Sequence, residues 1–242
     1  MGVKVKQFGG GARPVTAFSD DFNRAGSTQG FGANWLYGGF QVQSLAFANL
    51  GPVGIDTQQA TWQATGVLAN TQVPINWYAV PVMSALNGRS QFVQFTFKSN
   101  NAVLGSRQLF IGAGVLGGYV DTGAGSDFRE YLLWTVSGGG FANDEIHISR
   151  FDNGAFTELV NVAGVNIVTA PADSVFRLNA TVVSASVTVE AFKNGVSIGS
   201  LVDNTASRAT SGSQFMGRRM WVSGAAPGTG DARIDNFVCG KL

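Results

Sequence analysis

The segment SVTVEAFKNGVSIGSLV, residues 186–202, is the strongest indication of fold class in this chain. Two runs rich in β-branched and apolar residues lie on either side of Asn194-Gly195. Asn-Gly accepts the positive φ angles that a two-residue hairpin turn requires, and runs of this composition suit a half-buried pleated surface. The segment therefore predicts an antiparallel β-hairpin.

Similar short runs follow one another along much of the chain, separated by Gly, Asn, Asp or Pro. They are Gln91–Lys98, Gln108–Ile111, Tyr131–Val136, Glu145–Phe151, Val175–Val183, Val187–Phe192, Met220–Ser223 and Ala232–Cys239. In the first run, apolar Val93, Phe95 and Phe97 alternate with polar residues, which is typical of a strand with one buried face. All six prolines lie outside these runs. We therefore expect an all-β chain that forms an antiparallel two-sheet β-sandwich.

Composition excludes several classes of protein. A chain of 242 residues can bury one large core without a disulfide, and the single cysteine, Cys239, can form neither an intramolecular disulfide nor a thiolate metal site. A net charge of +1 predicts no nucleic-acid partner, and 45% hydrophobic residues exclude a disordered chain. No apolar run approaches the length of a membrane span, and the start MGVKVKQFGGG lacks the apolar core of a secretory signal. We therefore expect no membrane partner.

The first 17 residues differ from the rest of the chain. They carry Lys4, Lys6 and Arg13 without any acidic residue, and they include the triple glycine 9–11. Residues 18–242 form the expected single sandwich domain, which is slightly acidic. We interpret residues 1–17 as a flexible basic N-terminal arm that anchors the domain to another protein. The alternative is an ordinary frayed terminus.

Two motifs match enzyme signatures by spacing alone. Gly112–Gly117 fits the dinucleotide-binding pattern G-x-G-x-x-G, but the residues that follow cannot open the required helix, so we interpret these glycines as β-bulges or close sheet packing. Gly195–Gly199 fits the G-x-S-x-G nucleophile elbow, but it lies in the predicted hairpin. Ser197 is therefore expected to be a solvent-facing strand residue.

A third pattern places Glu145, His147 and Ser149 on one face of a strand. Retaining glycosidases need two carboxyl groups about 5.5 Å apart across the scissile bond. The partner carboxylates are missing here. We therefore expect no catalytic residues and no enzymatic activity.

Acidic residues near both ends of the domain suggest a metal. Asp20 and Asp21 lie near the first strand and Asp235 near the last, and their oxygens are ligands of the kind that calcium prefers, provided that the two strands are neighbours. The alternative is that these residues cap strand ends without metal. No other cofactor is expected.

Aromatic residues supply the remaining signal. Trp35 and Tyr37 follow the first strand, and Trp77-Tyr78 lies between two prolines. Exposed aromatic faces stack on sugar rings, so these four residues are the candidates for glycan binding. Alternatively, they fill the sandwich core or a subunit interface.

Three segments together carry a family resemblance: FSDDFNR at residues 18–24, GANW at 32–35 and DARIDNF at 231–237. They resemble the first and last strands of concanavalin A-like jelly rolls, which include laminin G-like and glucanase-like sandwiches. The resemblance implies a jelly roll whose terminal strands are neighbours. Members of that family serve as lectins, glycosidases, adhesion modules and domains of tailed-phage particles, and the catalytic ones use a carboxylate strand that this chain lacks.

Two hypotheses of function follow. The first is a non-enzymatic structural protein of a tailed-phage virion, a capsid decoration or fibre-type component made in the host cytoplasm without a signal peptide. Its arm would attach it to other virion proteins such as the major capsid protein, and we expect a homo-oligomer. The second is a carbohydrate-binding module or lectin, with or without a calcium ion at the terminal acidic residues. The two hypotheses are compatible with each other.

Overall fold

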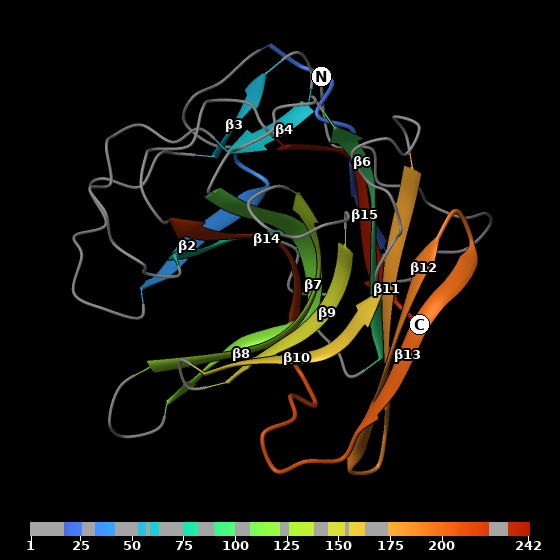
Figure 1. Ribbon diagram of the computed structural model, residues 1–242. Coiled ribbons are helices and arrows are strands. Elements are labelled where there is room, and N and C mark those ends of the chain that lie inside the picture. Colours follow the sequence, from blue (N-terminus) through green and yellow to red (C-terminus); the bar gives the residue numbers. More distant parts are fainter. Residues whose placement is uncertain are drawn as a thin grey trace, which may run out of the picture.

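The computed structural model describes residues 17–25, 32–41, 53–56, 59–62, 75–81, 90–99, 107–121, 126–137, 145–152, 155–162, 174–222 and 232–242. Every regular element in these ranges is a β-strand, and the strands form two antiparallel sheets (Figure 1). Among the described residues, no helix is long and apolar enough to cross a membrane. The expected antiparallel two-sheet β-sandwich is confirmed.

The two sheets face each other and differ in strand order. The eight-stranded sheet has the order β13 (Val196–Asp203), β12 (Ser186–Lys193), β11 (Ser174–Val183), β6 (Gln91–Ser99), β15 (Ala232–Lys241), β4 (Gln59–Trp62) and β3 (Val53–Asp56), and β1 (Ala17–Asp20) also pairs with β15. The seven-stranded sheet has the order β10 (Ala155–Val162), β9 (Glu145–Asp152), β8 (Ser126–Ser137), β7 (Arg107–Asp121), β14 (Ser213–Val222), β5 (Ile75–Pro81) and β2 (Trp35–Gln41). This second sheet is curved, and its hollow side faces away from the eight-stranded sheet (Figure 1).

The predicted hairpin is confirmed as β12 and β13. Asn194 and Gly195 form its turn, with φ angles of 50° and 82°. The turn is also fixed to β11, because Asn194 exchanges two hydrogen bonds with the backbone of Val175 at 2.7 and 2.8 Å. Ser197 is exposed and donates a hydrogen bond to the Glu190 carboxylate at 2.7 Å, as expected for a solvent-facing strand residue rather than a nucleophile.

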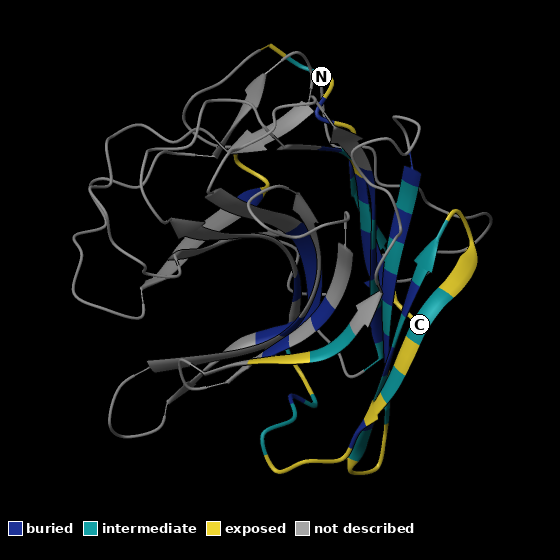
Figure 2. Cartoon of the chain, in the orientation of Figure 1, coloured by how far each residue is buried: buried dark blue, intermediate teal, exposed yellow. Residues whose placement is uncertain are grey.

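The core lies between the two sheets. Along β11 and β12, buried and partly exposed residues alternate strictly over most of each strand (Figure 2). The inward residues of these strands include Phe176 and Leu178, and β7 of the facing sheet contributes Ala113 and Val115, all of which are fully buried. Burial of this apolar surface stabilises the sandwich by about 0.8 kcal/mol for each CH₂ group.

The terminal strands are neighbours, as the family resemblance implies. In β1 and β15, Ala17 pairs with Gly240 and Asp20 pairs with Phe237, so β1 begins one residue inside the expected arm. Phe18 packs edge-on against Trp35, with ring centroids 5.4 Å apart. Cys239 is buried in this strand pair as a free thiol, and burial raises its pKa.

Two strands of the curved sheet are longer than expected. β7 was expected to end at Ile111 and β14 to begin at Met220, but both continue through glycine-containing segments. The pairing of β7 with β8 shifts register between Val115 and Gly118, and Leu116 has a φ of 56°. Of the three glycines in Gly112–Gly117, Gly117 lies at this β-bulge, whereas Gly112 and Gly114 are in regular register with Trp134 and Leu132.

Candidate binding face of the curved sheet

Strand register assigns the residues of the seven-stranded sheet to its two faces. Residues that lie directly opposite one another on neighbouring strands form a row across the sheet and share one face. One such row includes Ala113, Leu133 and Ile148. Ala113 and Ile148 are fully buried, and Tyr131, two residues before Leu133, bonds to Asp203 of the other sheet. This row, and the rows two residues away, therefore face the sandwich interior. The rows between them belong to the hollow face.

The central row of the hollow face combines aromatic and glycine positions. In register order from β9 to β2 it consists of His147, Trp134, Gly112, Gly217, Tyr78 and Gly38. Gly112 and Gly217 are adjacent in the middle strands, with an aromatic position on each side. Glycine in a strand interior leaves the backbone open to close approach by a ligand. This arrangement is a segment without side chains between two aromatic positions, and Gly112 within it is buried.

Register separates the four predicted stacking residues. Tyr37 shares the interior row of Ala113, and Trp77 shares the interior row of Ile111, two residues away. Trp35 is only 3% exposed and packs among Phe18, Phe22 and Phe237. The burial of Trp35 does not fit a sugar-stacking role, whereas the roles of Tyr37 and Trp77 stay predictions.

Tyr78 alone, of the four, has a position on the hollow face, and Trp134 was missed. Trp134 lies in a correctly predicted strand. It comes three residues after buried Tyr131, so the two take opposite faces of the strand, and this spacing was the signal that could have placed Trp134 on the hollow face.

The predicted common face of Glu145, His147 and Ser149 is consistent with the structure. They alternate along β9 with Ile148 and Arg150, whose side chains are buried. Their register partners on β8 are Val136, Trp134 and Leu132, none of which is acidic. The strand therefore brings no second carboxyl group into register with Glu145 on β8.

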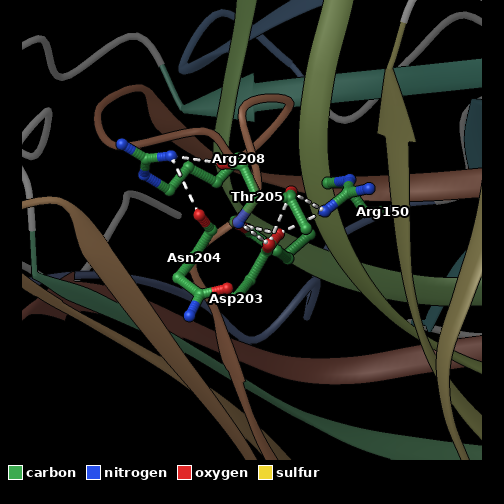
Figure 3. A network of polar contacts seen from close by, with 6 residues as sticks. Arg150, Asp203, Asn204, Thr205 and Arg208 are labelled. Atoms are coloured by element: carbon green, nitrogen blue, oxygen red, sulfur yellow. Dashed lines mark hydrogen bonds and ion pairs between the residues drawn. The ribbon is translucent and has the colours of Figure 1, made fainter.

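A buried polar network joins the two sheets on the interior side of β8 and β9 (Figure 3). The Tyr131 hydroxyl and Arg150 Nη1 donate to the same carboxylate oxygen of Asp203, at 2.7 and 2.5 Å. The other oxygen of Asp203 accepts bonds from the backbone and hydroxyl of Thr205, at 3.0 and 2.7 Å. The Asp203 side chain is 1% exposed. Sequence carried no local signal for this network, because its members are far apart along the chain.

The protonation states of the network follow from its contacts. Burial by itself raises the pKa of Asp203, but hydrogen bonds from Thr205, Tyr131 and Arg150 outweigh it and hold that pKa below its ordinary value. Burial, together with the bond to Asp203, raises the pKa of Tyr131. At neutral pH Asp203 is therefore charged and Tyr131 is neutral. Each carboxylate oxygen of Asp203 accepts two bonds, which suits a structural role.

A second polar bridge crosses the sandwich at the β7 bulge. Gln91 on β6 is fully buried, accepts a bond from the backbone N–H of Leu116 at 2.9 Å, and donates to the Gly212 carbonyl at 2.9 Å. Gly212 has a φ of 152° and lies against the backbone of Leu116 and Gly117. Gln91 therefore fixes both the bulge and the start of β14 to the other sheet.

The predicted calcium ligands have other partners. Arg24 forms a bidentate ion pair with Asp20, at 2.6 and 2.8 Å, and the same carboxylate accepts bonds from Trp35 Nε1 and the Phe22 backbone. Asp21 and Asp235 accept bonds from nearby backbone N–H groups, Asp21 just after β1 and Asp235 at the irregularity inside β15. Across the described ranges, no three His, Cys, Asp or Glu side chains form a group that could hold a metal ion. A cation at Asp20 would have to displace Arg24.

The predicted anchor residues Lys4, Lys6 and Arg13 lie outside the described residues. Their role stays a prediction.

Comparison with known proteins identifies the fold. No protein-family model matches the chain, and no curated protein sequence matches it. Among solved structures, an endo-1,3-beta-glucanase from Streptomyces sioyaensis is similar over 97% of this chain and 100% of its own, with a TM-score of 0.56 and 12% identity.

Two binding modules are similar as well. The CBM2 module of the evolved Dit protein of Lactobacillus casei BL23 phage J-1 has a TM-score of 0.52 and 10% identity, covering 93% of this chain and 96% of its own. The carbohydrate-binding module CBM66 from Bacillus subtilis has a TM-score of 0.50 and 12% identity, covering 89% and 100%. At these identities the likeness concerns the fold alone. The chain has the fold of a jelly-roll β-sandwich, as the resemblance of its terminal strands implied.

Proposed function

We propose that this chain is a non-catalytic carbohydrate-binding module, which holds a glycan across the hollow face of its seven-stranded sheet. The observation that carries the proposal is the central row, in which Gly112 and Gly217 lie between Trp134 and Tyr78. Sugar rings present flat apolar faces that stack on aromatic side chains, and glycines between two aromatic positions place no side chain between the two stacking surfaces.

The size of the row favours an oligosaccharide over a single sugar. Trp134 on β8 and Tyr78 on β5 are separated by three strand spacings, because β7 and β14 lie between them. At about 4.8 Å for each spacing, the two aromatic positions are about 14 Å apart across the sheet. A glycan that contacts both would lie across the strands.

Binding without hydrolysis is the better interpretation of β9. Glu145 is paired with Val136 on β8, so this pair of strands does not supply the two carboxyl groups that glycoside hydrolysis uses. Proteins of similar fold include both an enzyme and binding modules, so the fold does not choose between these functions. The aromatic and glycine positions of the hollow face support the proposal of binding.

Replacing Trp134 or Tyr78 with alanine should weaken glycan binding at least tenfold, because each change removes one stacking surface, about 1.4 kcal/mol or more. A glycan array on the full chain identifies the ligand, and calorimetric titration measures the affinity of each variant. Phe192→Ala, on the eight-stranded sheet, is the matched control and should bind as the unaltered chain does. Unchanged affinity in both aromatic variants would place the binding site elsewhere.

A structural role in a tailed-phage particle is the second candidate function. Two observations favour it: residues 1–17 carry three basic and no acidic residues, and the fold resembles a module of a phage Dit protein. A basic arm would dock on an acidic particle surface and leave the sandwich exposed. A glycan-binding face and a particle-bound arm are compatible in one chain.

Deleting residues 1–16 should remove the chain from particles without unfolding the sandwich. The deletion stops before Ala17 because that residue pairs with Gly240. Mass spectrometry of particles purified from the native source measures how much of the chain is incorporated, and a melting curve of the purified chain reports its fold. Equal incorporation of the truncated chain would contradict attachment through the arm.

A further inference from the structure

The outer face of the eight-stranded sheet, which points away from the curved sheet, carries polar and aromatic side chains where β6 and β11 lie side by side (Figure 1). The inward residues of these strands, such as Phe176, are fully buried, so their neighbours in sequence point outward. In this outer row and the next, Gln94 is opposite Arg177, and Phe92 is opposite Asn179. All four side chains are partly exposed. We call these four residues the Arg177 cluster.

Two contacts hold the guanidinium of Arg177 in one orientation. It lies over the ring of Phe92, with its Cζ atom 4.1 Å from the ring centroid, and its Nε atom donates to Asn179 Oδ1 at 2.7 Å. Phe92 belongs to the neighbouring strand and Asn179 to the same strand as Arg177. Ordering a free side chain costs affinity when a complex forms, so a ligand of Arg177 would meet a donor whose orientation is already set.

Arg177 has no counterion among the described residues, whereas Arg24 and Arg150 each pair with an aspartate. Glu190, one strand away on β12, accepts a bond from the Ser197 hydroxyl and is not paired with Arg177. Burial lowers the pKa of Arg177, and no carboxylate in the described ranges raises it again. Arginine stays protonated at neutral pH nevertheless. The outer face therefore holds a partly buried positive charge without compensation.

The two terminal nitrogens of Arg177 are open to solvent. Within the described ranges, the buried side-chain atoms that lack a hydrogen bond belong to Arg150 and Arg208. Nη1 and Nη2 of Arg177 have no bond to any described residue, so both reach solvent. The amide of Gln94 also forms no hydrogen bond in this part of the chain. Opposite residues of an antiparallel pair have Cβ atoms about 5 Å apart, so Arg177 and Gln94 can contact one ligand group together.

We propose that the Arg177 cluster is a docking site for a second protein, which places an aspartate or glutamate side chain against it. A carboxylate matches the paired N–H donors of a guanidinium, and the Gln94 amide can donate a further bond. Arginine and aromatic side chains are enriched at the centres of protein interfaces, which favours a protein as the occupant. The site lies on the sheet opposite the candidate glycan face. This inference does not depend on glycan binding.

Side-chain NMR of the full chain tests the proposal with a defined probe. The probe is a blocked octapeptide of alternating glutamate and serine, and the reference is the same peptide with glutamine in place of glutamate. The Nε–H signal of Arg177 should shift on titration with the acidic peptide and not with the reference. Backbone amide signals of β6 and β11 follow binding in the variants. Arg177→Gln should weaken binding about tenfold or more, because it removes the charged donor pair.

Two further variants separate a specific contact from general attraction. Lys241→Gln is the matched control, because it removes one positive charge from an exposed position on β15 of the same sheet, and it should bind as the unaltered chain does. Arg177→Lys keeps the charge but loses the two-pronged donor, so it should bind more weakly than the unaltered chain. Melting curves show whether each variant is folded.

An Arg177 signal that does not shift at millimolar acidic peptide overturns the proposal. So does an equal response to both peptides, because the carboxylates would then contribute nothing. Loss of affinity in Lys241→Gln equal to that in Arg177→Gln would also overturn it, since the attraction would then reflect net charge. Glucuronic acid is titrated in parallel. A shift with this sugar acid and none with the peptide would assign the cluster to an acidic glycan and overturn the protein partner.

Discussion

Asp203→Ala should lower the free energy of unfolding by about 3–5 kcal/mol, because it leaves the buried guanidinium of Arg150 without its counterion. Arg150 is 8% exposed, and its Nη1 atom contacts Asp203 at 2.5 Å. The substitution also removes the acceptor of the Tyr131 hydroxyl and the two bonds that Thr205 donates to Asp203. Chemical denaturation followed by tryptophan fluorescence measures the loss.

Asp21→Ala is the matched control for this substitution. Asp21 is exposed and its carboxylate accepts a local backbone bond from Asn23, so its loss should change the free energy of unfolding by about 0.5 kcal/mol or less. A loss in Asp203→Ala as small as that in the control would show that the network does not hold the sheets together.

The same variant should change how stability depends on pH. The pKa of Asp203 is lower in the folded chain than in the unfolded chain, so the folded state favours the charged form. Its contribution is complete above the unfolded-chain pKa of about 4, and it is lost as the pH falls from there through the lowered native pKa. Stability of the unaltered chain should therefore fall more steeply in acid than that of Asp203→Ala.

Gly212→Ala should destabilise the sandwich by about 3 kcal/mol or more, combining backbone strain and overpacking. A Cβ atom at this position would lie 2.5 Å from the backbone carbon of Leu116 and 2.6 Å from the Gly117 oxygen. Both are backbone atoms of the β7 bulge, so no side chain can rotate away. β14 must move from β7, and the bond from Gln91 to the Gly212 carbonyl is strained as well.

Gly195→Ala separates the two causes. Gly195 also has a positive φ, 82°, but nothing lies within 4 Å of the place that an added methyl group would take, so only the conformational cost of about 1 kcal/mol applies. Thermal melting of both variants gives the comparison. Similar losses in the two would mean that the contact with the bulge is relieved at no cost.

The sequence predicts the hairpin at residues 186–202 well because its determinants are local: alternation along β12, and a turn that Asn194-Gly195 can adopt. The lengths of β7 and β14 were underestimated because glycines such as Gly112 and Gly217 are poor strand formers by themselves. In the folded chain each of these strands has partners on both sides, and those hydrogen bonds compensate for the weak local preference.

The candidate face was predicted only in part, since it depends on register between strands distant in sequence. Trp77 and Tyr78 are equivalent in the sequence, but they take opposite faces of the sheet because neighbouring residues in a strand alternate. Tyr78 and Trp134 are brought into one row by two intervening strands. Residue types alone cannot reveal that row. The strand-end acids were recognised, but the ion pair of Asp20 with Arg24 was not.

The pairing of the first and last strands also determines how the domain responds to a pulling force. Ala17 is opposite Gly240, so a load applied through both ends of the domain would separate β1 from β15 one residue pair at a time. This opening would proceed from Ala17 to Asp20, where the bonds from Arg24, Trp35 and Phe22 converge. A load applied through one end of the domain only would not separate β1 from β15 in this way. The position of the attachment would therefore decide the mechanical strength of the domain.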